Sequence, residues 1–464
     1  MPEIAAGVAQ PQPEQARDLE VRHAAALVVG IIIGSGIFLV PTEMMQAVGS
    51  ARLVFLAWIV GGVLSFFGAV TYAELGAMKP GAGGEYIYVR DAYGPLLGFL
   101  YAWTWMTIGK PASIATVSIG MVRVLGNFPL LGFFRTEILG FGILSERISI
   151  TMGHAFAATV VVLLTALNYI GVRKAGEFQV VFTVLKVLMI VAIAVVCFGW
   201  GAGQWENFSS LHEGARGGIA GFMVALIAAL WAYDGWNNLN MVAGEIRRPE
   251  RDIPRALIFG VAAVAFLYML TNAAVQYMMP AAAVAAAERP ASDAMRLAAG
   301  ELGAGLVSAG MALSMLVTLN GQILAGARIN YAVARDGYFF SSLATVHPRY
   351  HTPTVSLILS AVLTIILILV GGNFQQLFSL AIFAAWLFYM IAASSIFVFR
   401  RREPETPRPY KALGYPVVPT LFVLASAVLL YYSFATNLRN SLWGSLVILA
   451  GVPVYYGFAG KKRG

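Results

Sequence analysis

Residues 31–40 read IIIGSGIFLV, an apolar stretch whose middle is occupied by Gly34, Ser35 and Gly36. The stretch is apolar enough for the interior of a membrane helix, yet glycine is a poor helix former that costs about 1 kcal/mol relative to alanine. A helix interrupted in hydrocarbon leaves backbone N–H and C=O groups without partners, and each such group is energetically expensive. The stretch therefore predicts a membrane helix with a break that something polar must satisfy.

The composition of the whole chain supports a membrane setting. The chain has 464 residues, of which 59% are hydrophobic and only 12% are charged, and its mean hydropathy is +0.75. These values lie far from those of soluble globular chains. Apolar stretches long enough to span hydrocarbon as helices, at about 20 residues each, start near residues 22, 51, 95, 153, 176, 217, 254, 301, 352, 375, 414 and 441. The sequence thus predicts an all-α polytopic membrane protein with 12 transmembrane helices and excludes a barrel.

A single transmembrane domain is expected over residues 21–459, because no linker separates the apolar stretches. Residues 1–20, rich in Pro, Gln and Glu, are predicted to be a disordered cytoplasmic tail, since they lack the basic segment that opens a signal peptide. Residues 460–464 form a short basic tail. The longest outer loop, residues 126–150, is rich in Gly and Phe and is expected to pack on the membrane face.

Lysine and arginine are distributed unevenly between the predicted loops. Sorting the loops by side places 21 of the 31 basic residues on one face and 8 on the other, with Lys110 and Lys186 inside helices. By the positive-inside rule, both termini are cytoplasmic, which predicts a multi-pass protein of the inner (cytoplasmic) membrane. The net charge of +8 is explained by basic residues beside anionic lipid headgroups of the bilayer, so no nucleic-acid partner is expected.

A second apolar stretch is interrupted in the same way. Residues 217–243 contain the run WAYDGWN at 231–237, which puts Asp234 and Gly235 inside a predicted membrane helix. The two breaks fall in helices one and six, the spacing expected when two five-helix repeats have inverted topology. Paired interruptions of this kind are the best sequence indication of a transporter binding site.

A zwitterion would satisfy both ends of a broken helix. Free N–H groups at a helix start attract a carboxylate, and free carbonyls at a helix end attract an ammonium, each aided by the helix dipole. Glycine lets the backbone unwind and approach a solute closely. Gly34 and Gly36 alone are explained equally well as close-packing positions between helices, but the aspartate in the second break favours a binding site.

The chain resembles the amino acid–polyamine–organocation superfamily, and most of all its L-type amino acid transporter family, bacterial type. The similar motifs are IIIGSGIF, YAELGAMKPGAGGEYIYVRDAYGP at 72–95, WAYDGWNNLN at 231–240, EIRRPERDIPRAL at 245–257 and ARDG at 334–337. The resemblance implies a LeuT-like fold with 5+5 inverted repeats, in which helices one and six are discontinuous. Helices eleven and twelve would be peripheral.

The resemblance places an amino acid substrate at the two breaks. Its carboxylate would meet the backbone amides of Ser35 and Gly36, and its ammonium the carbonyls of Ile32, Trp231 and Asp234. Trp231 lies where the family carries an aromatic residue that closes over the substrate from outside. The predicted substrate-binding residues are Ile32, Gly34, Ser35, Gly36, Ile37, Trp231, Ala232, Asp234 and Asn238, with Ile37, Trp231, Asp234 and Asn238 as candidates for selectivity.

Two ionisable residues lie deep in predicted membrane helices, where charge is expensive and indicates function. Asp234 either caps the unwound backbone beside polar neighbours such as Asn237 or meets a cationic substrate side chain; capping is favoured because Asp readily bonds nearby N–H groups. Lys186 matches the helix-five lysine that replaces a sodium ion in sodium-independent members of the family, a coupling and gating role. The alternative is a snorkelling lysine, and a proton-coupled role also stays open.

The sequence predicts sodium-independent exchange of neutral L-amino acids by alternating access. The alternatives are a proton-coupled or cationic amino acid or polyamine carrier of the same superfamily, and a transporter-like amino acid sensor. An enzyme is not expected, and neither a metal nor a cofactor is predicted, because the five histidines scatter to helix ends and loops.

Three further features concern the partner chain, the inner gate and the shape of one helix. The resemblance implies a monomer without the disulfide-linked heavy chain of eukaryotic members, because the loop between helices three and four has no cysteine; the single cysteine, Cys197, lies in helix five. The Gly-rich segment before Glu85 is explained equally well as part of an inner gate or as a permissive turn. Lys110 is given no role, and Pro111 is expected to kink its helix.

Overall fold

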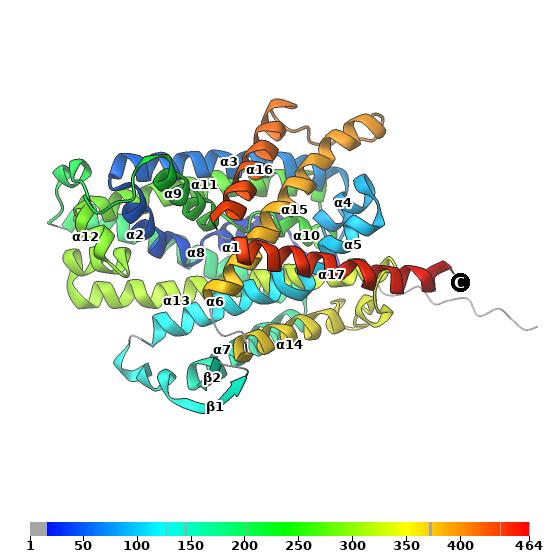
Figure 1. Cartoon of the computed structure of the whole chain (residues 1–464), viewed down its shortest axis with the longest axis horizontal. Coiled ribbons are helices and arrows are strands. Elements are labelled where there is room, and N and C mark those ends of the chain that lie inside the picture. The colour runs from blue at the N-terminus through cyan, green and yellow to red at the C-terminus, as the bar shows by residue number, and fades with distance from the viewer. Residues whose placement is uncertain are drawn as a thin grey trace, which may run out of the picture.

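A computed structural model gives the fold (Figure 1), and the residues it describes are 16–126, 128–143, 146–200, 202–370, 374–436 and 438–463. The predicted N-terminal tail lies outside the described residues up to residue 15, as does residue 464 of the predicted basic tail.

The described chain is built from α-helices and one two-stranded sheet. The helices are α1 Val21–Ile32, α2 Gly36–Val48, α3 Ala51–Met78, α4 Glu85–Tyr93, α5 Pro95–Thr104, α6 Lys110–Leu125, α7 Met152–Tyr169, α8 Val172–Trp200, α9 Gly218–Ala232, α10 Asn238–Met241, α11 Pro249–Met278, α12 Ala281–Ala286, α13 Pro290–Arg335, α14 Thr354–Val370, α15 Phe374–Arg402, α16 Val417–Thr436 and α17 Leu438–Arg463. The strands are β1 Glu137–Ile143 and β2 Glu146–Thr151.

The predicted polytopic helical architecture is confirmed. Each of the twelve apolar stretches falls on a helix or on consecutive helices. Ten helical segments of the described chain are long and apolar enough to cross a membrane, and α9 and residues 354–369 of α14 are shorter apolar helices. Most of the helices run along the long axis of the molecule in Figure 1, as expected of a bundle that spans a bilayer.

Both predicted breaks are present in the structure. α1 ends at Ile32 and α2 begins at Gly36, while α9 ends at Ala232 and α10 begins at Asn238. α2 packs against α9, and α1 packs against α8, α11 and α13. The two breaks therefore face each other inside the bundle, where helices from distant parts of the sequence meet. The inverted relation between helices one to five and six to ten stays a prediction.

The loop of residues 126–150, which is predicted to be an outer loop, contains regular structure that the sequence analysis did not predict. A 3₁₀ turn, Pro129–Arg135, leads into an antiparallel hairpin in which Leu139 of β1 pairs with Ile150 of β2. Phe134 anchors the loop on α7, because it is buried and its ring centroid lies 4.8 Å from that of Phe156. A hairpin satisfies the backbone N–H and C=O groups of a long loop within the loop itself.

The helix that contains Pro111 has a π-helical turn, Trp105–Gly109, between α5 and α6. Proline has no N–H to donate, and its ring crowds the carbonyl four residues earlier. A π-helical turn contains one extra residue, so the proline ring has more room and the carbonyls of the turn bond to N–H groups five residues later. Such bulges are frequent at functional sites. The expected distortion at Pro111 therefore takes the form of a π-bulge.

The two described ends of the chain lie on the same side of the bundle. Before α1, the N–H of Leu19 donates to the carbonyl of Glu245 (2.9 Å), and the Glu245 side chain forms a fully buried ion pair with Arg328 near the end of α13 (2.8 Å). Near the end of α17, the ring of Phe458 packs 5.0 Å from that of Phe339, which follows α13. An even number of membrane spans predicts this arrangement.

Candidate functional site

The end of α1 is held by an ammonium group. Lys186 on α8 is 0% exposed, and its Nζ donates hydrogen bonds to the carbonyls of Gly30 (2.8 Å) and Ile33 (2.5 Å). These carbonyls lie at the end of α1, where a helix leaves C=O groups without intrahelical partners. A cation there also complements the helix dipole. The side chain thus points into the break, whereas a snorkelling lysine would extend toward the headgroups.

Two hydroxyl groups on α13 complete this cluster of donors. Ser314 Oγ donates to the carbonyl of Ile33 (2.8 Å), and Thr318 Oγ1 donates to the carbonyl of Gly30 (3.1 Å). The sequence analysis missed both residues, although their spacing of four places them on one helix face. Together with Lys186, they supply the hydrogen bonds that the interrupted helix no longer makes.

The start of α2 presents backbone N–H groups to the same break. Within the described residues, the N–H groups of Ser35 and Gly36 donate to no protein group, and the Ser35 side chain does not cap the helix. α2 also approaches α9 very closely, because a Cβ on Gly36 would lie 2.9 Å from both Cα and Cβ of Ala232. Position 36 therefore has no room for a side chain without movement of one broken helix.

The second break is a tight turn that packs on the first. The N–H of Asp234 donates to the carbonyl of Trp231 (3.1 Å), and Gly235 has a φ of +114°. A Cβ on Gly235 would also lie 2.7 Å from Cγ2 of Ile31 on α1. Glycine is required here for two reasons, its left-handed conformation and the close approach of α1.

A tyrosine hydroxyl joins the two breaks. Tyr268 on α11 is fully buried, and its hydroxyl lies within hydrogen-bond distance of the carbonyls of Ile32 (2.9 Å) and Ala232 (2.8 Å), the last residues of α1 and α9. The hydroxyl has one proton, so it donates to one carbonyl at a time. It thereby couples the ends of the two broken helices.

In the transporter that the resemblance implies, replacing Tyr268 with phenylalanine is expected to slow transport about tenfold without unfolding the protein. The change leaves a buried carbonyl without a donor, which costs about 1–3 kcal/mol. The check is the initial rate of amino acid exchange in liposomes. Tyr233→Phe is the matched control, since the buried Tyr233 hydroxyl has no hydrogen-bond partner in the described chain. Equal rates in the two variants would show that the bridging hydroxyl is dispensable.

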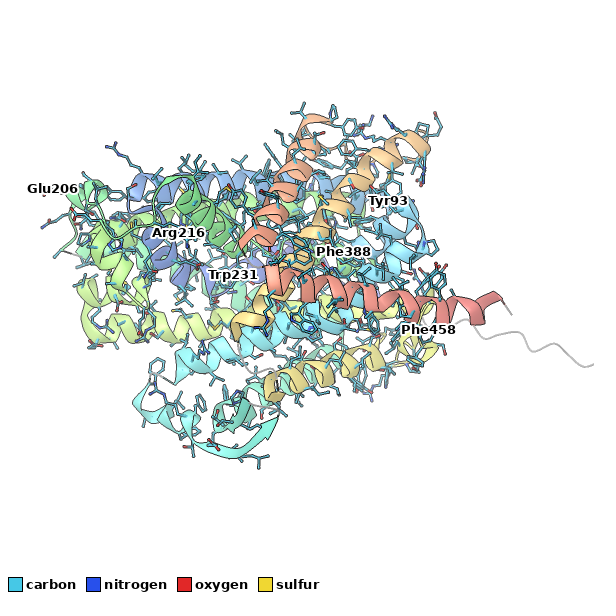
Figure 2. The ribbon with its side chains drawn as sticks, viewed as in Figure 1. Tyr93, Glu206, Arg216, Trp231, Phe388 and Phe458 are labelled. Atoms are coloured by element: carbon cyan, nitrogen blue, oxygen red, sulfur yellow. The ribbon has the colours of Figure 1, made fainter. Side chains whose placement is uncertain are left out.

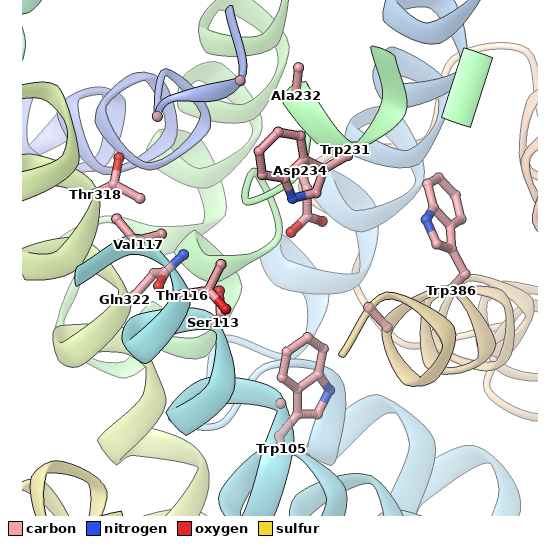
Figure 3. Close-up of a pocket in the computed structure, with 14 residues that line it drawn as sticks. Trp105, Ser113, Thr116, Val117, Trp231, Ala232, Asp234, Thr318, Gln322 and Trp386 are labelled. Atoms are coloured by element: carbon pink, nitrogen blue, oxygen red, sulfur yellow. The ribbon is translucent and has the colours of Figure 1, made fainter. Parts of the chain in front are cut away.

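A cavity of about 90 Å3 lies between the two breaks, α6, α13 and α15 (Figure 3). In Figure 3 the Asp234 carboxylate lies across the cavity from Ser113 and Gln322. Of the predicted site residues, five line this cavity, namely Gly34, Gly36, Trp231, Ala232 and Asp234. Ser35 lines a neighbouring cavity, and the remaining three predicted residues, Ile32, Ile37 and Asn238, line neither.

Trp231 lines both the first cavity and a second one of about 410 Å3, as do Thr116 and Val117 of α6, so these three residues lie between the two cavities. The second cavity is also lined by Arg123 and Arg289, two of the eight basic residues that belong to the face predicted to be the outer one. Figure 2 shows Trp231 in the interior, between Glu206 at one end of the molecule and Phe458 at the other. The tryptophan therefore lies between the candidate site and the face that the distribution of basic residues predicts to be the outer one.

Replacing Trp231 with alanine is expected to raise the KM of the amino acid uptake that the resemblance implies by at least about tenfold. Loss of the ring removes buried contact area and opens a path by which water from the second cavity reaches the bound substrate. Trp231→Phe keeps an aromatic ring and is expected to have the smaller effect. The KM of each variant is measured in liposomes. An unchanged KM for Trp231→Ala would contradict a closing role for this residue.

Asp234 has partners in the protein and also faces the cavity. Its Oδ1 accepts a hydrogen bond from the hydroxyl of Tyr389 on α15 (2.8 Å), which also lies 3.3 Å from Oδ1 of Asn237. These contacts agree with the interpretation that Asp234 belongs to the polar support of the turn. Because the carboxylate also lines the cavity, a contact with a substrate side chain stays open.

Lys110 was given no role from the sequence, yet it supports the second break. It is 4% exposed, its Nζ donates a hydrogen bond to Oδ1 of Asn238, and it lies 4.9 Å from the ring centroid of Trp105. The Asn238 amide in turn donates to the carbonyl of Gly235 (2.8 Å). A lysine directly before a proline in a membrane helix was the available signal.

Further polar atoms on the cavity wall lack protein partners. Nε1 of Trp105, Oγ1 of Thr116 and Oε1 of Gln322 are buried and form no hydrogen bond within the described residues, and all three residues line the cavity. Buried polar groups are nearly always hydrogen-bonded, so these atoms are suited to a polar ligand. No group of three His, Cys, Asp or Glu side chains that could hold a metal occurs in the described chain.

Comparison with known proteins supports a transporter. Residues 19–458 match the amino acid permease family. The chain is 31% identical to the serine/threonine exchanger SteT of Bacillus subtilis, over 96% of this chain and 97% of that protein. It is 32% identical to the human cystine/glutamate transporter (95% and 85% covered) and 33% identical to the rat large neutral amino acids transporter small subunit 2 (95% and 80% covered).

Proposed function

Because the chain belongs to the amino acid permease family, we propose that it exchanges neutral L-amino acids across the cytoplasmic membrane by alternating access, without sodium. The observation that carries this proposal is the pair of broken helices that face each other around a cavity. Exchange is also supported by the name of the Bacillus subtilis relative, a serine/threonine exchanger. The protein is not an enzyme, since the relatives are transporters.

The substrate is seated by backbone groups. Its carboxylate accepts hydrogen bonds from the N–H groups of Ser35 and Gly36 at the positive end of α2, which no protein group occupies in the described chain. Its ammonium lies at the negative ends of α1 and α9, near the carbonyls of Ile32 and Trp231. The Ile32 carbonyl already accepts from Gly34 N–H (2.7 Å) and from a tyrosine hydroxyl, so the ammonium takes over one of these places.

Independence from sodium rests on the donors at the end of α1. The Lys186 ammonium and the hydroxyls of Ser314 and Thr318 bond the carbonyls of Gly30 and Ile33. A sodium ion needs oxygen atoms with free lone pairs, and these carbonyls already have donors on them. The protonated Lys186 side chain thus takes the place of a bound cation.

Alternating access uses the closures on the two sides of the cavity. Trp231 lies between the cavity and the outer side, and the buried Arg328–Glu245 ion pair closes the side on which both chain ends lie. We assign this second side to the cytoplasm, because it carries the excess of basic residues. Both termini of the inner-membrane protein are then cytoplasmic.

The cavity favours small polar neutral substrates. The partnerless polar atoms of Trp105, Thr116 and Gln322 would pair with a hydroxyl or amide on the substrate. A cationic substrate is the second candidate, favoured by the single observation that the Asp234 carboxylate lines the cavity. An amino acid sensor or proton-coupled carrier is the remaining alternative.

We propose that the carrier is a monomer and works without a disulfide-linked partner. Its only cysteine, Cys197, is 0% exposed inside α8 and lies 3.9 Å from the sulfur of Met295. A sulfur atom enclosed in this way does not reach another chain. The name of the rat relative describes a small subunit, so the oligomeric state is tested on the purified full chain by light scattering.

The proposed function is tested by transport in liposomes that contain the purified chain and a mixture of unlabelled amino acids. Uptake of labelled serine, leucine, arginine and glutamate is measured with and without sodium and with and without a pH gradient. The proposal predicts rapid serine uptake that ignores sodium. Arginine uptake faster than serine uptake would establish the cationic alternative, and intact serine binding without any uptake would establish a sensor.

A further inference from the structure

A buried polar network adjoins the substrate cavity, and the proposed exchange of neutral amino acids assigns no role to the charges in it. It contains three ionisable side chains from three parts of the chain: Glu85 at the start of α4, Lys110 at the start of α6 and Asp234 in the turn after α9. Glu85 is 0% exposed and Lys110 is 4% exposed. Asp234 alone of the three lines the cavity. Three ionisable groups that lie together inside a bundle of membrane helices require a physical explanation.

Hydrogen bonds connect the two carboxyl groups. The Tyr389 hydroxyl lies 2.8 Å from Oδ1 of Asp234 and 3.3 Å from Oδ1 of Asn237. The Asn237 amide donates to Oε1 of Glu85 (2.6 Å), and the Tyr101 hydroxyl donates to Oε2 of Glu85 (2.8 Å). A continuous path of hydrogen-bonding groups thus runs from the cavity wall at Asp234 to the fully buried Glu85.

Among the described residues, one cation faces these two carboxylates. Lys110 interacts electrostatically with both Glu85 and Asp234, but its Nζ bonds Asn238. Within the described chain, neither carboxylate has a Lys, Arg or His nitrogen within the 4.0 Å of an ion pair. The other titratable groups that face the network are phenols, which are neutral when protonated: Tyr72 of α3, Tyr88 of α4, Tyr101 of α5 and Tyr389 of α15.

The charges of the network do not balance when all its groups are ionised. Two carboxylates and one ammonium leave one net negative charge, and a charge without a counterion is very costly in a low-dielectric interior. One proton on a carboxylate oxygen removes this charge. We propose that the network binds one exchangeable proton, shared between Asp234 and Glu85. The proton comes from water in the cavity, forms an O–H bond on a carboxylate, and leaves by the reverse step.

This proton gives the cavity a second ligand besides the amino acid. When a neutral amino acid occupies the cavity, the proton stays bound and the network remains neutral. A substrate with a cationic side chain beside Asp234 supplies the missing positive charge itself, and the proton is then released to the cavity. The bound proton thus serves as a substitute for a positive charge on the substrate.

The proposal is tested by infrared spectroscopy on the purified full chain without substrate at neutral pH. A protonated carboxyl has a C=O stretching band separate from those of carboxylates and amides. Glu85→Gln and Asp234→Asn each remove one negative charge while keeping the shape and hydrogen-bonding capacity of the side chain. Because the remaining carboxylate is then balanced by Lys110, each single change is expected to remove the band of one protonated carboxyl completely.

Two further variants fix the interpretation of this experiment. Lys110→Met leaves two carboxyls without a cation, so the band is expected to gain the intensity of a second protonated carboxyl. Glu301→Gln removes an exposed carboxylate, whose side chain is 81% exposed, and is expected to leave the band unchanged. The spectra of all variants are compared at equal protein concentration after gel filtration.

The proposal is overturned if neither Glu85→Gln nor Asp234→Asn reduces the band, because the network is then fully ionised. It is also overturned if only one of the two reduces it, because the proton then belongs to a single carboxyl and is not shared. The measurement needs no transport, so its failure is distinct from a failure of the proposed exchange activity.

Discussion

Replacing Lys186 with methionine is expected to reduce amino acid exchange by about 100-fold or more. Methionine retains an apolar stem but donates no hydrogen bond to the carbonyls of Gly30 and Ile33, which Lys186 contacts at 2.8 and 2.5 Å. A buried hydrogen bond from a charged group contributes about 1.5–3 kcal/mol, and about 1.4 kcal/mol corresponds to a tenfold change. Loss of two such bonds frees the end of α1, on which the proposed substrate site is built.

The control for this substitution lies on the same helix. Lys174 on α8 is exposed, so Lys174→Met changes the net charge by the same amount without touching α1. Both variants are compared by the initial rate of serine exchange at equal amounts of folded protein in the liposomes. A Lys186→Met protein as active as Lys174→Met would show that the ammonium has no role beyond filling space.

A methyl group at position 36 is expected to weaken substrate binding by about tenfold to 100-fold, and Gly36→Leu is expected to abolish it. The added Cβ would lie 2.9 Å from Ala232, which forces α2 and α9 apart. Overpacking of this kind costs about 1–3 kcal/mol. The N–H groups proposed to hold the substrate carboxylate then move away from the carbonyls proposed to hold its ammonium.

Gly34 offers a matched control for the change at position 36. A Cβ on Gly34 would meet Oγ1 of Thr318 at 3.7 Å and the carbonyl of Ile32 at 3.9 Å, both ordinary contacts. Gly34→Ala is therefore expected to bind labelled serine much more tightly than Gly36→Ala in equilibrium binding to the purified protein. Full binding by Gly36→Leu would defeat the assignment of the site to the two breaks.

The sequence alone was sufficient to locate both breaks and the lysine on α8 that bonds the end of α1. Glycines inside an apolar run, and an aspartate inside another, are local signals that do not depend on the neighbouring helices. The break at residues 33–35 and the turn at 233–237 confirm these positions. The sequence also identified Lys186 as a functional candidate, because a charged residue in the middle of an apolar helix is costly and therefore rare without a function.

The sequence did not show the hydroxyl groups that bond the free carbonyls of the broken helices. Tyr268, Ser314 and Thr318 are residues of ordinary type in membrane helices, and their importance comes from the carbonyls they meet across the bundle. Hydroxyl residues in membrane helices often bond their own helix, and Thr271 does so with the carbonyl of Leu267 at 2.8 Å. Only the packing of α11 and α13 against α1 separates these cases.

The roles of Lys110 and Glu85 become apparent only from their tertiary contacts. Lys110 precedes Pro111 in the sequence, and this pair predicts only a distorted helix. Glu85 follows a Gly-rich segment that is explained equally well as part of an inner gate or as a permissive turn. The fold brings both into one buried network with Asp234, through contacts that span more than a hundred residues of sequence. Sequence spacing carries no information on such encounters.

Serine uptake into liposomes that contain the purified chain, and that are either loaded with unlabelled serine or empty, tests the central claim most directly. The claim is that the two broken helices form an obligatory amino acid exchange site whose built-in cation is Lys186. It predicts rapid uptake of labelled serine into loaded liposomes, little uptake into empty ones, and no change when sodium is replaced by choline. Equal uptake into loaded and empty liposomes, or uptake that requires sodium, would contradict it.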